Sequence, residues 1–283
     1  MELLLFFAII FFSVTQSAMT KFYTKTSDDV IGFNVLKACS SFLLFAFFAL
    51  FGFNFHIPTI LFGAISGVLW TVSMFTAYCA LKEGPMALTS ILVSFSILIP
   101  IIYGFLFLHE PLTLFKITGI CLLFCSVFLI NAKKKQSEQK ANKRWFFFVA
   151  LTFLANGINS IVQKNHQTAY PQLYRKEFMI ASMLICSLIF CCIALIQSKP
   201  KKEKKTKKQN SYAIIAGITN ALANFFTIVL SGFQDASALF PSLTAGSTTL
   251  TLLCGIFVFK EKFKNVQIVG LLLGIGSIVF LNL

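Results

Sequence analysis

The stretch MALTSILVSFSILIPIIYGFLFLHEPLTLFKITGICLLFCSVFLIN, residues 86–131, contains two long apolar runs that meet at the polar sequence HEPLT. A helix needs about 20 mostly apolar residues to cross the roughly 30 Å of hydrocarbon in a bilayer. Both runs approach that length, and neither shows the polar face that a soluble helix turns toward water. The stretch therefore predicts two transmembrane helices joined by a short turn.

The rest of the chain has the same character. Of its 283 residues, 57% are hydrophobic and 12% are charged, whereas soluble domains average about 45–50% apolar and 25% charged. Cutting the sequence at charges, prolines and polar clusters predicts ten spans, so we expect an all-α integral membrane protein. The predicted spans are Leu3–Thr20, Asn34–Phe53, Pro58–Leu81, Met86–Leu108, Leu112–Asn131, Trp145–Val162, Phe178–Gln197, Tyr212–Leu230, Ala236–Phe259 and Val266–Leu283. We expect the first span to be a retained helix, because Lys21 and Lys25 follow it, whereas a signal peptide begins with its basic residues.

The sequence contains an internal repeat. A shift of 151 residues, without a gap, superposes the fourth and fifth spans on the ninth and tenth. Matched leucines are common in an apolar background, but matched Glu, Asn and Gly in one register indicate a duplication. The coinciding pairs are Ala87/Ala238, Leu88/Leu239, Leu92/Leu243, Ser96/Ser247, Gly104/Gly255, Glu110/Glu261, Ile117/Ile268, Gly119/Gly270, Leu122/Leu273, Ser126/Ser277 and Asn131/Asn282.

A second shift, of 143 residues, aligns the first span with the sixth. It places Ser13, Gln16, Ser17, Thr20 and Lys21 opposite Asn156, Asn159, Ser160, Gln163 and Lys164. Each repeat then holds five helices, and because five is odd the second repeat enters the membrane from the opposite side. We expect a first repeat at residues 1–132, a basic linker at 133–144 and a second repeat at 145–283. Inverted repeats around a site near the bilayer midplane are typical of secondary transporters.

Several of these residues also carry a family resemblance. The sequence AYCALKEGP at residues 77–85, then Pro100, then HEPLT at 109–113 and a Gly-containing apolar helix resembles the EamA-type branch of the drug/metabolite transporter superfamily. The sequence FKEK at 259–262 and the helix that follows it resemble the same family, although Thr251 stands where the first half has its proline. The resemblance covers essentially the whole chain. It implies ten helices in two inverted five-helix halves that export or import small metabolites.

Ionisable residues are scarce inside the predicted spans, which restricts the function. The chain has 24 basic and 10 acidic residues, for a net charge of +14, and every acid falls at a span end or in a loop. A proton-coupled exporter of lipophilic cations is expected to need a carboxylate within the membrane, so we favour a neutral, zwitterionic or anionic metabolite. Basic residues confined to loops exclude a soluble nucleic-acid-binding protein. The expected partners are therefore the lipid bilayer and a small-molecule metabolite, with no nucleic acid and no predicted oligomeric state.

Uncharged polar residues form stripes on four predicted spans. Residues three, four or seven positions apart share one face of a helix, and this spacing recurs on the first, third, sixth and eighth spans. Such residues often join helices by hydrogen bonds, but the backbone cannot fully satisfy an amide. Packing and cavity lining therefore stay open as alternatives. The substrate-binding site is predicted at Gln16, Trp70, Asn156, Asn159, Asn220 and Asn224.

Other polar residues have plainer interpretations. Glu110 and Glu261 could gate opposite membrane faces, but Glu110 precedes Pro111, and we favour a carboxylate that caps a helix N-terminus. Lys37 either snorkels to the interface, which we favour, or meets an anionic group at a cavity mouth. The three histidines are assigned to separate loops, so we expect no metal site and no cofactor. No catalytic set of Ser, His and Asp can be assembled, and the eight cysteines lie in apolar runs, so we do not expect an enzyme.

Together these patterns predict a multi-pass transporter of the cell membrane that works by alternating access. A membrane-embedded lipid-modifying enzyme and a passive channel are the alternatives. Nineteen of the 24 Lys and Arg fall on the side that carries the connections after odd-numbered spans. The positive-inside rule then predicts that both termini lie outside the cytoplasm. The resemblance implies the reverse, because the family is usually drawn with both termini in the cytosol.

Overall fold

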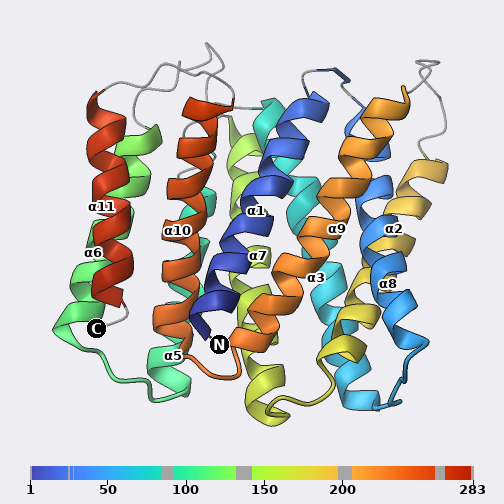
Figure 1. Cartoon of the computed structure of the whole chain (residues 1–283), viewed down its shortest axis with the longest axis horizontal. Helices are drawn as coiled ribbons and strands as arrows, with labels where there is room; N and C mark the ends of the chain where they lie inside the picture. The colour runs from blue at the N-terminus through green and yellow to red at the C-terminus, as the bar shows by residue number, and fades with distance from the viewer. Residues whose placement is uncertain are drawn as a thin grey trace. The chain divides into compact units, whose positions relative to one another are not determined.

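The computed structural model describes residues 2–24, 26–27, 29–83, 89, 92–131, 142–196, 206–258 and 265–281. These residues are helical apart from turns and short loops (Figure 1). The described helices overlap the predicted spans, but the ends differ. The sixth continues seven residues beyond Val162, the second is Val30–Ala49 instead of Asn34–Phe53, and the eighth begins at Lys207 instead of Tyr212. The elements are α1 (Glu2–Thr24), α2 (Val30–Ala49), α3 (Ile57–Glu83), η1 (Phe95–Ile97), α5 (Leu98–Phe107), α6 (Leu114–Asn131), α7 (Lys143–Ala169), α8 (Arg175–Ile196), α9 (Lys207–Leu230), α10 (Ala236–Phe257) and α11 (Asn265–Leu281).

Many of these helices have the length and composition to cross a membrane. Within the described part of the chain six do so, in α1, α2, α3, α7, α8 and α9. Three further apolar helices are shorter, at Leu92–Phe107, Leu114–Ile130 and Asn265–Leu281. The expectation of an all-helical protein with membrane-spanning helices is confirmed at this level. The count of ten spans and their inverted arrangement stay predictions.

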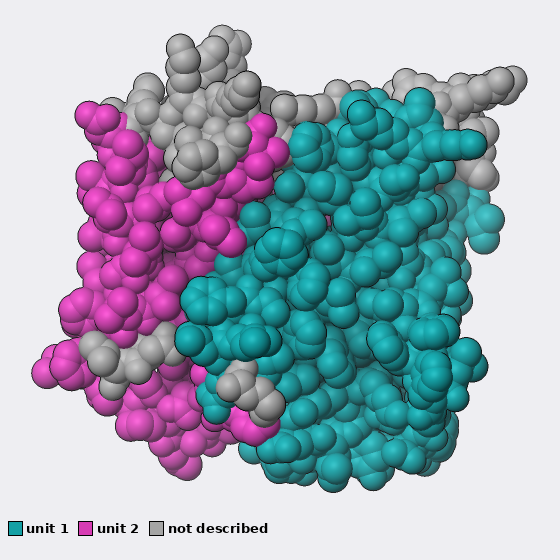
Figure 2. Space-filling view, in the orientation of Figure 1, with its two compact units in different colours: residues 1–71, 165–232 teal, residues 72–164, 233–283 magenta. Residues whose placement is uncertain are grey.

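The chain divides into two compact units, coloured separately in Figure 2. Unit 1 contains residues 1–71 and 165–232, and unit 2 contains residues 72–164 and 233–283. The boundaries fall inside α3 and α7, so each unit combines segments from both halves of the sequence.

Unit 1 is organised by an antiparallel pair, α1 and α9, which lie side by side in Figure 1. The ring centroids of Phe12 and Phe226 are 6.0 Å apart, and those of Phe22 and Tyr212 are 5.5 Å apart. Helix α2 packs against both α8 and α9. It approaches α9 so closely that a Cβ at Gly217 would overlap the Ser40 hydroxyl. Small residues at such contacts let helix backbones come together, as is common between membrane helices.

Polar contacts at the two ends of unit 1 show where the loops before and after α2 lie. If successive helices cross the membrane in alternating directions, these loops must lie at opposite ends. At one end the Gln209 side chain, in the first turn of α9, donates to the Thr26 carbonyl between α1 and α2, at 2.8 Å. At the other end the Asn54 backbone N–H donates to Glu177 at 3.0 Å, and Lys176 bonds the Gly52 carbonyl. The loops on either side of α2 therefore lie at opposite ends of this unit.

Unit 2 is organised by an antiparallel pair of its own, α6 and α11 (Figure 1). The Ser126 hydroxyl donates to the Gly270 carbonyl at 2.6 Å, and the Gln267 amide donates to the Ile130 carbonyl at 3.0 Å. A Cβ added to Gly119 would come within 2.7 Å of Leu281. Helix α10 packs against α5 and α11 in the same unit.

The pairing of α2 with α8 gives a direct test by cross-linking. The Sγ atoms of Cys39 and Cys191 are 3.9 Å apart, and both thiols are free. A disulfide needs about 2.05 Å between the sulfurs, which a small side-chain movement supplies. Copper phenanthroline is therefore expected to link the two cysteines, and mass spectrometry after proteolysis should recover the joined peptides. In Cys39→Ser that product should be missing; a bond from Cys39 to any other cysteine would contradict the pairing.

Candidate functional site

The polar stripes on α3 and α7 meet within unit 2. The Ser73 hydroxyl donates to the Asn156 Oδ1 atom at 2.5 Å, and the hydroxyls of Thr76 and Thr152 are 2.8 Å apart. These contacts hold Asn156 to α3, as expected of an amide that joins helices. Asn159 lies one turn further along α7 and is 8% exposed.

The stripes on α1 and α9 meet within unit 1. The ring contacts of the two helices place Gln16 level with Asn220. Asn220 is 4% exposed, yet its side-chain amide, like that of half-buried Gln16, has no hydrogen-bond partner among the described residues. The Asn224 amide instead donates to the backbone carbonyl of Asn220 at 2.8 Å. Gln16 and Asn220 thus lie at one level of the α1–α9 pair.

The six predicted site residues divide between the units. Trp70 on α3 is half-buried and belongs to unit 1. With it in unit 1 are Gln16, Asn220 and Asn224, while Asn156 and Asn159 belong to unit 2. Asn156 bonds Ser73 on another helix, which supports a packing role, whereas Asn224 bonds the backbone of its own helix. Of the predicted set, Gln16 and Asn220 are therefore the better candidates for contact with a substrate.

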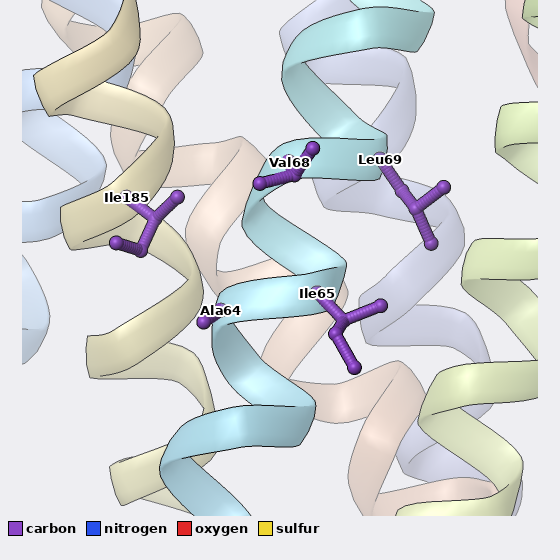
Figure 3. Close-up of a pocket in the computed structure, with 5 residues that line it drawn as sticks. All are labelled: Ala64, Ile65, Val68, Leu69 and Ile185. Carbon is purple, nitrogen blue, oxygen red and sulfur yellow. The ribbon is translucent and has the colours of Figure 1, made fainter.

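An apolar pocket of ≈ 350 Å³ lies between α3 and α8 in unit 1. It is lined by Ala64, Ile65, Val68, Leu69 and Ile185 (Figure 3). The side chains of Ile65 and Val68 are 51% and 45% exposed, as suits a surface that faces lipid chains. A lining without polar groups cannot orient a polar metabolite, so this pocket does not match the predicted site.

Glu110 is a capping residue, but it does not cap the helix that follows it. Helix α6 begins only at Leu114, and the buried Glu110 carboxylate accepts from the backbone N–H groups of Ala236 and Ser237 at 2.7 and 2.8 Å. It thus neutralises the start of α10, where free N–H groups and the helix dipole favour a negative charge. Capping is confirmed, whereas the choice of helix was wrong. Glu261 lies outside the described residues.

Two lysines add positive charge to the same end of unit 2. Lys116 Nζ is 2.8 Å from Asp235 Oδ2, and Lys164 Nζ is 2.5 Å from the Gln234 carbonyl. These contacts and those of Glu110 hold the start of α10 and the residues before it against the N-terminal side of α6 and against α7. This set of contacts was missed from the sequence because its acceptors include backbone groups.

Two histidines, expected in unrelated loops, belong to one network in unit 1. His166 lies inside α7 and is fully buried, which corrects its assignment to a loop. The Thr59 hydroxyl lies between the two imidazoles. Its oxygen is 3.0 Å from His166 Nε2 and 2.9 Å from His56 Nδ1. The Gln167 amide bonds His166 and accepts from Arg175 Nε at 2.9 Å. In the described residues no three His, Cys, Asp or Glu side chains gather as metal ligands.

Comparison with known proteins identifies a family whose sequence model matches this chain. The sequence model of the EamA-like transporter family matches residues 1–132 and 143–283. An uncharacterized protein of Haemophilus influenzae is 25% identical over 192 residues, which are 65% of this chain and 62% of that protein. The matched stretch therefore spans less than two thirds of that relative. One solved crystal structure covers 98% of this chain and 94% of its own, with a TM-score of 0.78 and 14% identity, and so shares the fold.

Proposed function

We propose that this chain, which belongs to the EamA-like transporter family, is a secondary transporter that moves a small polar metabolite across the cytoplasmic membrane by alternating access. The resemblance read from the sequence is confirmed by the family match, and members of the family are membrane transporters. The metabolite class, the mechanism and the inverted repeat belong to the proposal. The observation that carries it is the symmetric packing of α6 against α11.

That packing exchanges equivalent residues between the two helices. A Cβ at Gly119 would meet Leu281, and a Cβ at Gly270 would meet Ile130 at 3.0 Å. The shift of 151 residues converts Gly119 into Gly270 and Ile130 into Leu281. Each contact is therefore the image of the other, as in an isologous interface with a two-fold axis. Because the helices are antiparallel, that axis is perpendicular to them, which supports repeats of opposite orientation in the membrane.

The polar pairs of the two units follow the same relation. In unit 2, Ser73 on α3 bonds Asn156 on α7. The shifts of 151 and 143 residues convert this pair into Asn224 on α9 and Ser13 on α1. The ring contacts between α1 and α9 place these two residues at one level in unit 1. Serine and asparagine have exchanged helices under this relation, while the Asn224 amide bonds the Asn220 carbonyl of its own helix.

The amides of Gln16 and Asn220 are the groups from which we expect the chemistry of transport. Gln16 and Asn220 offer both donors and acceptors, which can replace the water that a polar metabolite loses on entering the membrane. An ordinary carbonyl, amide, hydroxyl or carboxylate group could bind there. Gln16 corresponds to Asn159 under the 143-residue shift, so the repeat supplies a second amide at the equivalent position.

Transport is tested in proteoliposomes that contain the purified protein. Comparing metabolites in cells with and without the protein identifies a species whose level changes, and that species is then supplied in radioactive form. A carrier should show saturable uptake and counterflow, in which unlabelled substrate inside the vesicles accelerates entry of the label. Linear uptake without counterflow would favour a channel, and chemical conversion of the compound would favour an enzyme.

The orientation is open to a separate test. Because 19 of 24 basic residues lie on one side, we expect both termini outside the cytoplasm. A fluorescent protein that folds only in the cytoplasm should stay dark when fused after Leu283, whereas alkaline phosphatase fused there should be active. A bright fusion at the C-terminus, with inactive phosphatase, would contradict the charge rule for this chain.

A further inference from the structure

Lys37 is a charged residue buried inside unit 1. It lies in the second turn of α2, within the apolar span Ile31–Ala49, and is 6% exposed. The sequence favoured a side chain that snorkels to the interface, and that interpretation stays a prediction; the low exposure shows that the neighbouring helices enclose most of the side chain. A lysine inside a membrane span is costly and is expected to have a function or a partner.

No acidic residue in the described part of unit 1 pairs with Lys37. Asp29 accepts from the Gly32 N–H at the start of α2, about two turns away. Glu177 accepts from Asn54 and lies 3.9 Å from Lys176. Glu2 is in the first turn of α1. The electrostatic neighbour of Lys37 is instead the Cys186 thiol on α8.

The groups around this ammonium are small and polar. Cys186 contacts the Thr71 hydroxyl on α3. One turn earlier on each helix, a Cβ at Gly67 would lie 2.5 Å from the Ser182 carbonyl, and the Ser182 and Ser66 hydroxyls are 3.4 Å apart. The Thr71 hydroxyl itself donates to the Gly67 carbonyl at 2.8 Å. Neither a hydroxyl nor a thiol can neutralise an ammonium, so the positive charge is left for a ligand.

The backbone that carries Lys37 is held firmly. The hydroxyls of Ser40 and Ser41 both donate to the Lys37 carbonyl, and Ser41 also bonds the Gly217 carbonyl on α9 at 2.7 Å. The fit of Gly217 against α2 fixes the same turn. The ammonium is thus presented from a rigid position, which favours specific binding.

We infer that the Lys37 ammonium binds the carboxylate of the transported metabolite, next to the Cys186 thiol on α8 and the Thr71 hydroxyl on α3. The inference rests on the proposed transport function and narrows the substrate to an organic acid or an amino acid. It also accounts for a buried charge that has no acidic partner among the described residues of unit 1, because the substrate supplies the anion.

The first test compares Lys37→Met with Lys116→Met in detergent and in proteoliposomes. Lys37→Met removes an unpaired charge, so its thermal midpoint should rise by about 2–4 °C, while transport per folded molecule falls at least tenfold. Lys116→Met should lower the midpoint, because it leaves Asp235 without the ion pair at 2.8 Å. Unchanged transport by Lys37→Met would overturn the inference, whatever its stability.

A second test does not depend on knowing the substrate. Acetate, pyruvate, succinate and L-leucine are each compared with the corresponding amide for their effect on the thermal midpoint of the wild-type chain. At least one acid, but not its amide, should raise the midpoint, and the rise should be lost in Lys37→Met and kept in part in Lys37→Arg. The inference fails if no acid acts, or if the effect survives in Lys37→Met.

Two controls separate the remaining explanations. Vesicles of phosphatidylcholine alone and vesicles with added phosphatidylglycerol distinguish a carboxylate from a lipid phosphate; a Lys37-dependent rise seen only with phosphatidylglycerol assigns the site to lipid and overturns the inference. Counterflow by the wild-type chain tests transport itself. Counterflow that persists unchanged in Lys37→Met rejects the Lys37 site alone, whereas linear uptake by the wild type rejects the proposed function.

Discussion

Replacement of Glu110 by alanine is expected to destabilise the protein by about 2–4 kcal/mol, because it leaves two buried backbone N–H groups without an acceptor. The carboxylate now receives those bonds from Ala236 and Ser237, at 2.7 and 2.8 Å. It is 7% exposed, so water does not readily take its place. Thermal and denaturant unfolding of the purified variant in detergent measure the loss, which should begin with the end of unit 2 that holds the start of α10.

Two further variants separate capping from gating. Glu110→Gln keeps one carbonyl acceptor and should recover part of the lost stability. Glu83→Ala is the matched control, because Glu83 accepts an exposed bond from the Asn142 side chain, at 3.2 Å, and exposed contacts contribute little. If Glu110 is a gating group instead, Glu110→Gln should fold with wild-type stability and fail in transport.

The contact between Glu110 and Gly104 shows what the repeat could predict. Under the 151-residue shift, Glu110 coincides with Glu261 and Gly104 with Gly255. These matches indicated that both residues have a structural role. A Cβ at Gly104 would lie 2.5 Å from the Glu110 carboxylate, so the matched glycine makes room for the matched acid. The helix that Glu110 caps could not be predicted, because backbone N–H groups 126 residues away leave no pattern in the sequence.

The end of α7 shows the opposite case. The apolar run stops near Val162, where polar residues follow, and hydropathy alone ends the helix there. The helix continues to Ala169 because distant groups satisfy its polar side chains: Thr59 bonds His166, and Arg175 bonds Gln167. The burial of Lys37 could likewise not be predicted from the sequence, because it depends on helices that are far away along the chain. Apolar spans and their order are local properties, and these partners are not.

The sequence predicted the amide stripes but not which amides would have partners within the protein. The second prediction tests that difference. Gln16→Leu and Asn159→Leu are each expected to reduce transport by about 10–100-fold, the loss that follows when a polar substrate group has no partner worth about 1–3 kcal/mol. Leucine has a similar volume and suits an apolar environment. Expression and thermal stability should therefore change little in Gln16→Leu, whose amide has no hydrogen-bond partner among the described residues.

Asn156→Leu provides the internal contrast, because this amide accepts the Ser73 hydroxyl at 2.5 Å. Its loss should cost about 0.6–2 kcal/mol of stability while transport per folded molecule survives. Thr118→Val controls for polarity alone, since Thr118 is exposed and bonds only its own helix at the Leu114 carbonyl. Initial transport rates and unfolding midpoints are measured on all four purified variants. Normal transport by both Gln16→Leu and Asn159→Leu would show that this amide pair does not contact the substrate. If these two variants also lose stability, Gln16 and Asn159 join helices, as Asn156 does.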